Sequence, residues 1–296
     1  MKLQNIFALI VTLIGFAACT SESELLDTAV NDDLVPVTIS LGSIQTKASV
    51  GLGTDEGTVQ NAVIGIFDSK GIPTITPIVL ESGNSELIRI PLVKSNAYAF
   101  VNVSTEDINT LKNISSMNDF KSYAITKQLT QVAAALPKFG EKTNFTPTAN
   151  GNIEIPVKQL TARLDVRVSV ELTENGQTVD ASFVKESLMW TDIFAESSST
   201  SGNDGNFTTI INSVTYDNVI NRTYSYPGVT PSITLVGTIN GERRSFSYTF
   251  NSTLEKDNVY LLNVKMKGDV SKPVTITVDY QMVNMGRENI NVPEFN

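Results

Sequence analysis

The stretch that decides the fold is LTARLDVRVSV at residues 160–170. Apolar side chains occupy every second position, at Leu160, Ala162, Leu164, Val166, Val168 and Val170. The positions between them hold polar or charged side chains, at Thr161, Arg163, Asp165, Arg167 and Ser169. A period of two places the two sets on opposite faces of a β-strand, and no helix can produce it. The stretch therefore predicts a long strand with one apolar face.

Segments on both sides of this stretch also have β-strand character, and turn-forming Gly, Asn, Pro and Ser separate them. The strands predicted before it cover residues 36–41, 62–67, 87–92, 97–103 and 153–157. Those predicted after it cover residues 188–194, 233–239, 245–250, 259–266 and 274–280. Asn240 and Gly241 are a type I′ hairpin signal between two of them. The sequence is therefore that of an all-β protein.

Only residues 105–136 look helical. Ser116 and Asp119 resemble a capping box ahead of Phe120, and residues 128–136 are rich in Leu and Ala. We expect a small helical insert that covers one edge or end of the first domain. The number of short strands predicts two β-sandwiches, at residues 48–157 and 158–296, with a boundary near Pro156.

The first 33 residues have the pattern of an exported, lipid-anchored chain. Lys2 precedes an apolar run at residues 6–18, which is shorter than the about 20 residues of a membrane span and fits a signal peptide over residues 1–18. The residues before Cys19 resemble a lipobox, and Cys19 is the only cysteine. We expect lipidation of Cys19, followed by a flexible acidic tether over residues 19–33. The alternative is an ordinary signal peptide with a chance cysteine.

Composition removes whole classes of chemistry. The chain has no histidine and one cysteine, which excludes Ser-His-Asp and Cys-His catalysis and the usual zinc sites. A net charge of −9 argues against nucleic acid as a partner. Carboxylate chemistry of the glycosidase kind survives, but Asp55 and Glu56 lie in sequence that we expect to be flexible, and the loop at residues 201–206 lacks the spacing of a cation site. We expect no enzyme activity, catalytic residue, metal or cofactor.

Aromatic residues of the second half allow a different function. Trp190, Phe194, Tyr216, Tyr224 and Tyr226 could form a platform for sugars, although aromatic residues on strands more often belong to a core. The platform would suit a surface glycan-binding lipoprotein of a nutrient-uptake system. This is the alternative to the function that follows from the resemblance below.

Four segments together resemble the Bacteroidetes fimbrillin family. Residues 63–68 (VIGIFD) and 98–103 (YAFVNV) are similar to its N-terminal domain. Residues 157–164 (VKQLTARL) are similar to its Arg-containing strand near the domain junction, and residues 258–264 (NVYLLNV) to its penultimate strand. The resemblance spans nearly the whole chain, although the family's closing strand often carries a Trp that residues 274–282 lack.

The resemblance implies two tandem transthyretin-like β-sandwiches and a surface-exposed lipoprotein of the outer membrane. It also implies a structural or adhesive fimbrial subunit that a protease cuts after a basic residue behind the first strand. Loss of that strand opens a groove, which a strand of a neighbouring subunit fills. The expected partners are other fimbrial subunits, the outer membrane through the lipid, and a host or bacterial receptor.

Lys47 is the candidate cleavage site under this resemblance. It lies between an alternating strand, with Val37, Ile39 and Leu41 on one face, and a Gly-rich stretch at residues 51–57 that we expect to be flexible. Residues 34–47 would then be the removable first strand. The alternative is an ordinary exposed loop lysine.

The C-terminal tail is the candidate donor strand. Ile290, Val292 and Phe295 are its apolar residues, and Pro293 marks an edge or added strand. The equal alternative is that the tail completes its own C-terminal sandwich.

Overall fold

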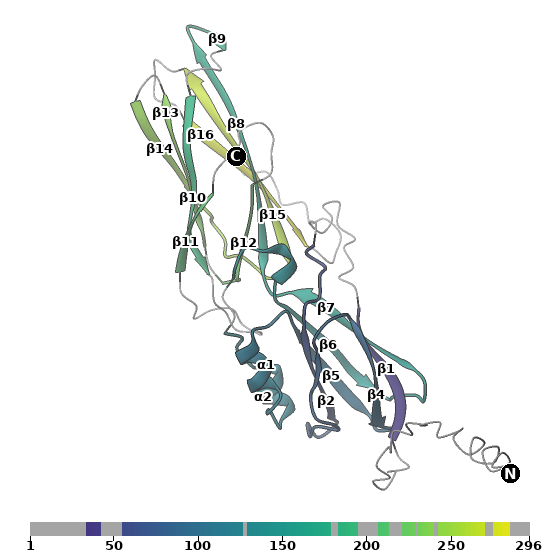
Figure 1. The fold of residues 1–296 in the computed structure, drawn as a ribbon. Coiled ribbons are helices and arrows are strands. Elements are labelled where there is room, and N and C mark those ends of the chain that lie inside the picture. The colour runs from purple at the N-terminus through teal and green to yellow at the C-terminus, as the bar shows by residue number, and fades with distance from the viewer. Residues whose placement is uncertain are drawn as a thin grey trace, which may run out of the picture. The chain divides into compact units, whose positions relative to one another are not determined.

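The computed structural model describes residues 34–42, 55–126, 129–178, 183–194, 207–212, 221–228, 230–239, 242–269 and 275–284 (Figure 1). Strands make up most of these residues, and the helices between them are short. The all-β prediction is confirmed. Within the described ranges, every helix falls short of the length and hydrophobicity that a bilayer span requires.

The first sheet has seven strands in the order β3-β2-β5-β6-β7-β1-β4. Their bounds are Leu34–Gly42 (β1), Ala62–Asp68 (β2), Ile78–Leu80 (β3), Ser85–Pro91 (β4), Ser95–Val101 (β5), Lys138–Phe145 (β6) and Asn152–Gln159 (β7). Ile39 of β1 and Ile90 of β4 belong to the same hydrophobic core as Ile64 of β2 and Leu80 of β3. The sheet therefore curls until its two ends enclose one core.

Strand β7 changes its partner along its length. Residues 152–156 pair parallel with β1, whereas residues 157–159 pair antiparallel with β6. Pro156 stands where the pairing changes, and its missing N–H explains why a proline is tolerated inside this strand. Gly140 of β6 lies opposite Val157, and a Cβ added to Gly140 would stand 2.7 Å from a methyl carbon of Val157. The close approach of β6 to β7 therefore requires glycine.

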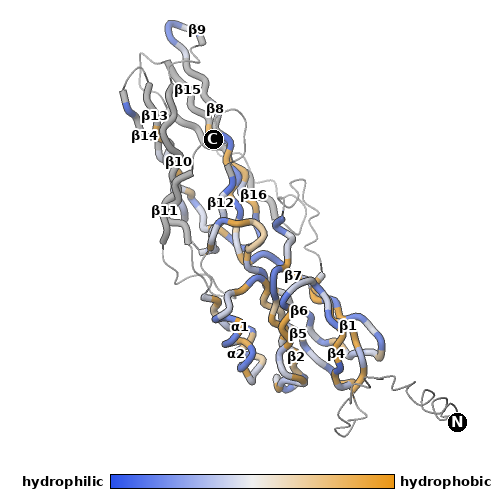
Figure 2. Tube along the Cα trace, viewed as in Figure 1, coloured by the Kyte–Doolittle hydropathy of each residue, from blue (hydrophilic) through white to orange (hydrophobic). Residues whose placement is uncertain are grey.

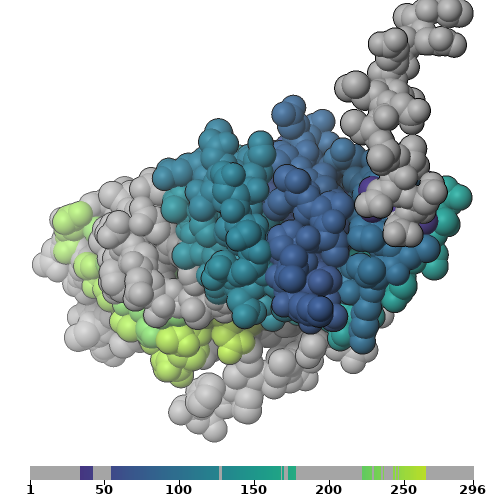
Figure 3. Space-filling model, turned by 90° about the horizontal axis from the view of Figure 1, so that it is seen from below, coloured from purple at the N-terminus to yellow at the C-terminus, as the bar shows by residue number. Residues whose placement is uncertain are grey.

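The helical insert covers a face of the first sheet and not its edge or end, so that part of the prediction is wrong. It contains α1 (Thr105–Leu111), α2 (Met117–Lys121) and the 3₁₀ turn η1 (Ala133–Ala135). The ring of Phe120 lies 5.5 Å from the rings of both Phe67 and Phe100, on the side of β2 and β5 that faces away from the enclosed core. Figure 3 shows the first sheet and the insert, coloured blue to teal, side by side on one face of the molecule.

The predicted capping is confirmed in part. Ser116 is the N-cap of α2 and accepts a hydrogen bond from the Asp119 N–H. The complete capping box lies ahead of α1 instead, where the Ser104 hydroxyl accepts from the Asp107 N–H and the Asp107 carboxylate accepts from the Ser104 N–H.

The helix predicted over residues 128–136 is wrong except for η1. Gln131 has a φ of 62°, which no right-handed helix can contain. Its side-chain amide donates to the Tyr224 carbonyl at 2.8 Å and accepts from the Tyr224 N–H at 2.8 Å. This contact with a distant strand overrides the helix propensity of the local sequence.

The second half of the chain contains two further sheets. Their orders are β11-β10-β13-β14 and β12-β8-β15-β16, with β9 paired to β8. The bounds are Ala162–Glu174 (β8), Gln177–Thr178 (β9), Phe183–Phe194 (β10), Phe207–Asn212 (β11), Asn221–Ser225 (β12), Ser232–Ile239 (β13), Glu242–Thr249 (β14), Asn258–Asp269 (β15) and Thr275–Asn284 (β16). Leu164 of β8, Leu262 of β15 and Ile233 of β13 share one core, so side chains of both sheets pack together. The antiparallel pair of β13 and β14 confirms the predicted hairpin.

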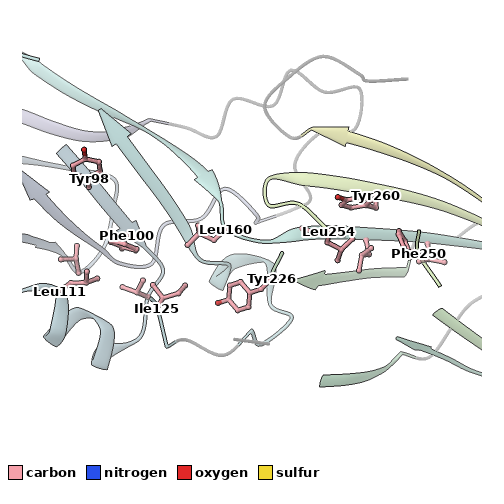
Figure 4. Close-up of a cluster of buried hydrophobic side chains, with 14 of the residues drawn as sticks. Tyr98, Phe100, Leu111, Ile125, Leu160, Tyr226, Phe250, Leu254 and Tyr260 are labelled. Carbon is pink, nitrogen blue, oxygen red and sulfur yellow. The ribbon is translucent and has the colours of Figure 1, made fainter. Parts of the chain in front are cut away.

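The core of the second half continues into the insert. The cluster includes Tyr98, Phe100, Leu111, Ile125, Leu160, Tyr226, Phe250, Leu254 and Tyr260 (Figure 4). Figure 2 shows hydrophobic residues along β2 and β5, the strands that carry one side of this cluster and one side of the enclosed core. Sheet membership changes between Gln159 and Ala162, whereas Pro156 lies inside β7.

All ten predicted strands overlap observed ones, but β3, β6, β9, β11 and β12 were not predicted. Strand β6, with the sequence KFGEKTNF, has too few apolar residues to show a pattern. Its Lys138 is fully buried, with an ammonium group that donates to the carbonyls of Thr58 at 2.9 Å and Leu136 at 3.1 Å. A buried lysine is rare unless it is paired, so composition alone favours a loop here.

Candidate functional site

Strand β1 is an interior strand of the first sheet although it lies at the start of the described chain. It pairs antiparallel with β4, from Leu34 opposite Pro91 to Ser40 opposite Ser85. On its other side it pairs parallel with β7, from Thr38 opposite Asn152 to Gly42 opposite Pro156. In Figure 1 it is the purple strand beside β4 and β7. Its backbone is therefore bonded on both sides.

The inward face of β1 carries the three residues that the sequence analysis assigned to the removable strand. Val37 and Ile39 are fully buried, and Leu41 is 3% exposed. They pack among aliphatic residues of β2, β3, β4, β5 and β7. Burial of each such side chain contributes about 1.5–3 kcal/mol. The strand is therefore a substantial part of the enclosed core.

Backbone hydrogen bonds hold β1 to the loops that flank it as well as to the strands. The Thr38 N–H donates to the Gly151 carbonyl at 2.9 Å, and the Leu41 N–H donates to the Asn84 carbonyl at 2.7 Å. The Pro36 carbonyl accepts from the Asn150 N–H at 2.7 Å. Without β1, the facing edges of β4 and β7 would present unpaired backbone groups, which are a template for another strand.

A buried ion cluster lies at the point where the chain returns to the fold after residues 43–54. Glu56 is fully buried, and its carboxylate lies 2.8 Å from the Arg163 guanidinium. The Tyr224 hydroxyl donates to the other oxygen of Glu56 at 2.7 Å. Arg163 also contacts Asp165 at 3.1 Å. The cluster therefore joins the turn at residues 55–57 to β8 and β12.

Arg222 closes the cluster on its partly exposed side. Its guanidinium donates twice to the Asp165 carboxylate, at 2.8 and 3.1 Å, and lies 3.8 Å from Glu56. The hydrogen bond with Asp165 raises the pKa of Arg222. Burial, with the neighbouring Glu56 carboxylate, raises the pKa of Tyr224, which stays a neutral hydrogen-bond donor. Two arginines thus balance two buried carboxylates.

The cluster corrects the expectation that residues 51–57 are flexible throughout. Of these, residues 55–57 form a turn in which the Thr58 N–H donates to the Asp55 carbonyl at 3.0 Å, and the Gln159 side chain donates to the Glu56 carbonyl at 2.9 Å. Sequence analysis missed Glu56 as a structural residue. The available signal was the pair of opposite charges at Arg163 and Asp165 within a strand pattern, because paired charges on one face suit burial.

A cavity of about 560 Å³ lies next to this cluster. It is lined by Lys121, Phe139, Glu141, Pro156, Lys158, Gln159, Leu160, Lys256 and Asp257. Asp257 is 6% exposed, and its backbone has a φ of 61°. Burial raises the pKa of the Asp257 carboxyl to about 6, against the opposing effect of Lys158, the Gln159 N–H and Lys256.

We expect Asp257→Asn to stabilise the protein at neutral pH. The folded state keeps the proton of Asp257 up to about pH 6, whereas the unfolded chain loses it near the ordinary pKa of 3.8. Stability therefore falls as the pH rises from about 4 to 6, and it stays lower above that range. Asn removes the ionisation and tolerates a positive φ. The free energy of unfolding of Asp257→Asn should exceed the wild-type value by about 1–3 kcal/mol at pH 7.

Urea titrations at pH 4, 5, 6 and 7 would measure this difference. The gap between Asp257→Asn and wild type should close toward pH 4. Glu154→Gln, at an exposed carboxylate of β7, is the matched control and should leave the profile unchanged. Parallel profiles for wild type and Asp257→Asn would contradict the prediction.

Several predicted site residues lie outside the described residues: Cys19, Lys47, Tyr216, Ile290, Val292 and Phe295. Of the aromatic residues considered for a sugar platform, Tyr224 is 3% exposed and Tyr226 is fully buried. Both belong to the interior, so the core interpretation is confirmed for these two. Trp190 and Phe194 lie on β10.

No protein-family model matches the sequence, and no curated protein matches it. Solved structures do share its fold. A candidate cell adhesion protein from Bacteroides eggerthii has a TM-score of 0.62 at 14% identity, with coverage of 85% of this chain and 96% of that one. A fimbrial assembly protein from Parabacteroides distasonis has a TM-score of 0.57 at 16% identity, with 84% and 98% covered. A fimbrilin from Porphyromonas gingivalis has a TM-score of 0.58 at 12% identity, with 86% and 98% covered.

These neighbours span nearly all of their own length on this chain. The resemblance to Bacteroidetes fimbrillins that four sequence segments indicated is therefore confirmed at the level of the fold.

Proposed function

We propose that this chain is a structural or adhesive subunit of a bacterial surface fimbria. In this proposal it is exported as a lipoprotein that Cys19 anchors in the outer membrane, and it polymerises by strand exchange after cleavage behind Lys47. The observation that carries the proposal is the position of β1, which is the first described strand and yet an interior strand of its sheet. The fold shared with fimbrial proteins supports the same role.

A first strand in this position can leave without unthreading the rest of the chain. Its departure would open a groove between β4 and β7, with aliphatic pockets that Val37, Ile39 and Leu41 now fill. A new strand in that groove would gain backbone hydrogen bonds on two sides and burial at alternate positions. An edge strand could offer a partner only one row of hydrogen bonds.

The two ends of the segment that contains Lys47 support the choice of that residue. Gly42 ends β1, and Glu56 is held by Arg163 and Tyr224. A cut after Lys47 would separate β1 from the sheet's remaining strands while Glu56 keeps the new N-terminal end of the domain attached to β8 and β12. The proposal therefore needs no further rearrangement of the first sheet.

We propose the C-terminal tail as the donor. Ile290 and Val292 repeat the two-residue spacing of Val37 and Ile39, and Phe295 adds a third apolar side chain. The tail follows β16, an edge strand that pairs with β15. Its attachment to an edge leaves it a route away from its own sheet.

Cleavage would act as the switch because of effective concentration. Before the cut, β1 is tethered beside its own groove, so an intermolecular strand competes against a very high local concentration. After the cut β1 can dissociate, and the incoming strand meets no tethered rival. Slow release of the new strand is expected because many contacts must break together.

Lys47→Ala tests this mechanism. A Lys/Arg-specific protease should convert the wild-type monomer into ladders of heat-labile, high-mass multimers on denaturing gels, and Lys47→Ala should stay monomeric. Lys70→Ala, at an exposed lysine between β2 and β3, is the control and should polymerise like wild type. Multimers from Lys47→Ala would remove Lys47 from the mechanism. A wild-type protein that is cut at Lys47 and stays monomeric would overturn strand exchange.

A further inference from the structure

The cavity between β6, β7, α2 and the loop ahead of β15 contains polar groups that the fold itself leaves unused. Gln159 is 1% exposed and Asp257 is 6% exposed, and both line the cavity. Within the described part of the chain, the amide oxygen of Gln159 and the Oδ1 of Asp257 have no hydrogen-bond partner. Such buried acceptors are rare in folded proteins and call for a donor.

The orientation of the Gln159 amide follows from its other contact. Its amide nitrogen donates to the Glu56 carbonyl at 2.9 Å, which accepts and cannot donate. The amide oxygen is therefore the atom left over. The ion cluster that buries Glu56 thus also holds Gln159 in place at the cavity.

The remaining lining has two kinds of surface. Phe139, Pro156 and Leu160 supply an apolar wall, and Phe139 is held by a stacked contact with the Tyr98 ring at 6.3 Å. An apolar wall with a few buried polar groups is the common form of a small-molecule site, and 560 Å³ lies within the size range of such sites. A ligand that fits must therefore combine an apolar face with hydrogen-bond donors.

Charge narrows the ligand further. Three lysines, Lys121, Lys158 and Lys256, line the cavity against two carboxylates, Glu141 and Asp257, so the lining carries a formal charge of 3 − 2 = +1. The whole chain carries −9. A local positive excess on an acidic protein attracts anions and disfavours an amine or guanidinium ligand. Lys121 is held at one wall, 5.7 Å from the centre of the Tyr98 ring.

We propose that this cavity binds an acidic saccharide unit. Ring hydroxyls donate to the oxygens of Gln159 and Asp257, the apolar face of the ring packs against Phe139 and Pro156, and the acidic group lies toward Lys158 and Lys256. The cavity shares no lining residue with β1, so the site is independent of the proposed strand exchange.

The test is a ligand-observed NMR titration of the uncleaved full chain with D-glucuronate, D-glucose and acetate. We expect saturable binding of glucuronate with a Kd below about 10 mM, and binding of glucose and of acetate at least about tenfold weaker, since each lacks one of the two recognised features. Gln159→Leu and Lys256→Ala should each weaken glucuronate binding by about tenfold. Lys112→Ala, at an exposed lysine outside the cavity, should bind as wild type does.

Lys256 is exposed, so Lys256→Ala keeps the test decisive if Gln159→Leu does not fold. No saturable glucuronate binding, or wild-type affinity in Lys256→Ala, would overturn the proposal. Equal affinities for glucuronate and glucose would overturn the acidic part of it. Because the titration uses the uncleaved monomer, its result does not depend on whether the chain polymerises.

Discussion

Replacing Arg163 by alanine is expected to lower the free energy of unfolding by about 3–5 kcal/mol, the usual cost of removing one partner of a buried ion pair. Arg163 is 1% exposed and bridges Glu56 at 2.8 Å and Asp165 at 3.1 Å. Without it, Asp165 keeps its two hydrogen bonds from Arg222, but Glu56 keeps only the Tyr224 hydroxyl at 2.7 Å and a more distant Arg222. Urea unfolding curves would measure the loss.

The matched control for this variant is Arg167→Ala. Arg167 lies on the same strand but is exposed, so its replacement should change stability by no more than about 0.5 kcal/mol. Removing the stranded charge as well should recover part of the loss. We therefore expect the double variant Arg163→Met, Glu56→Gln to lose less than the sum of the two single variants. A loss below about 1 kcal/mol in Arg163→Ala would show that Glu56 does not depend on Arg163.

Ile39→Ala is expected to destabilise the uncut protein by about 2–5 kcal/mol, because it empties a fully buried aliphatic position at the centre of β1. If β1 is the strand that leaves after cleavage, the same change should also speed polymerisation. Less burial then holds the leaving strand, and each 1.4 kcal/mol lost corresponds to about tenfold in its affinity. Multimer formation after the cut should therefore be at least about tenfold faster than in wild type.

Leu87→Ala separates the effect of burial from that of losing an aliphatic side chain. Leu87 lies on β4 directly opposite Thr38 of β1, and it is 69% exposed. Its replacement should change stability by no more than about 0.5 kcal/mol and leave the polymerisation rate unchanged. If Ile39→Ala is destabilised as expected but polymerises at the wild-type rate, release of β1 does not control assembly.

Local sequence patterns determined the strands of this protein. Alternation at residues 160–170 predicted β8, and alternation at residues 36–41 predicted β1 and its inward residues Val37, Ile39 and Leu41. These predictions succeed because the two-residue period is a property of the strand backbone, and the periodic side chains supply most of the burial. The hairpin of β13 and β14 followed from its turn residues for the same local reason.

Tertiary structure alone decided which polar residues are buried and where the strands belong. Arg163 and Asp165 alternate like solvent-facing residues, yet they are buried because Glu56, 107 residues before Arg163, lies against them. Gln131 leaves the helical conformation because Tyr224 binds its side chain, and β6 is a strand because its neighbours pair with it. A backbone period can be seen within a few residues, whereas the burial of a charge or the partner of a weak strand depends on groups far away in the chain, which no local pattern contains.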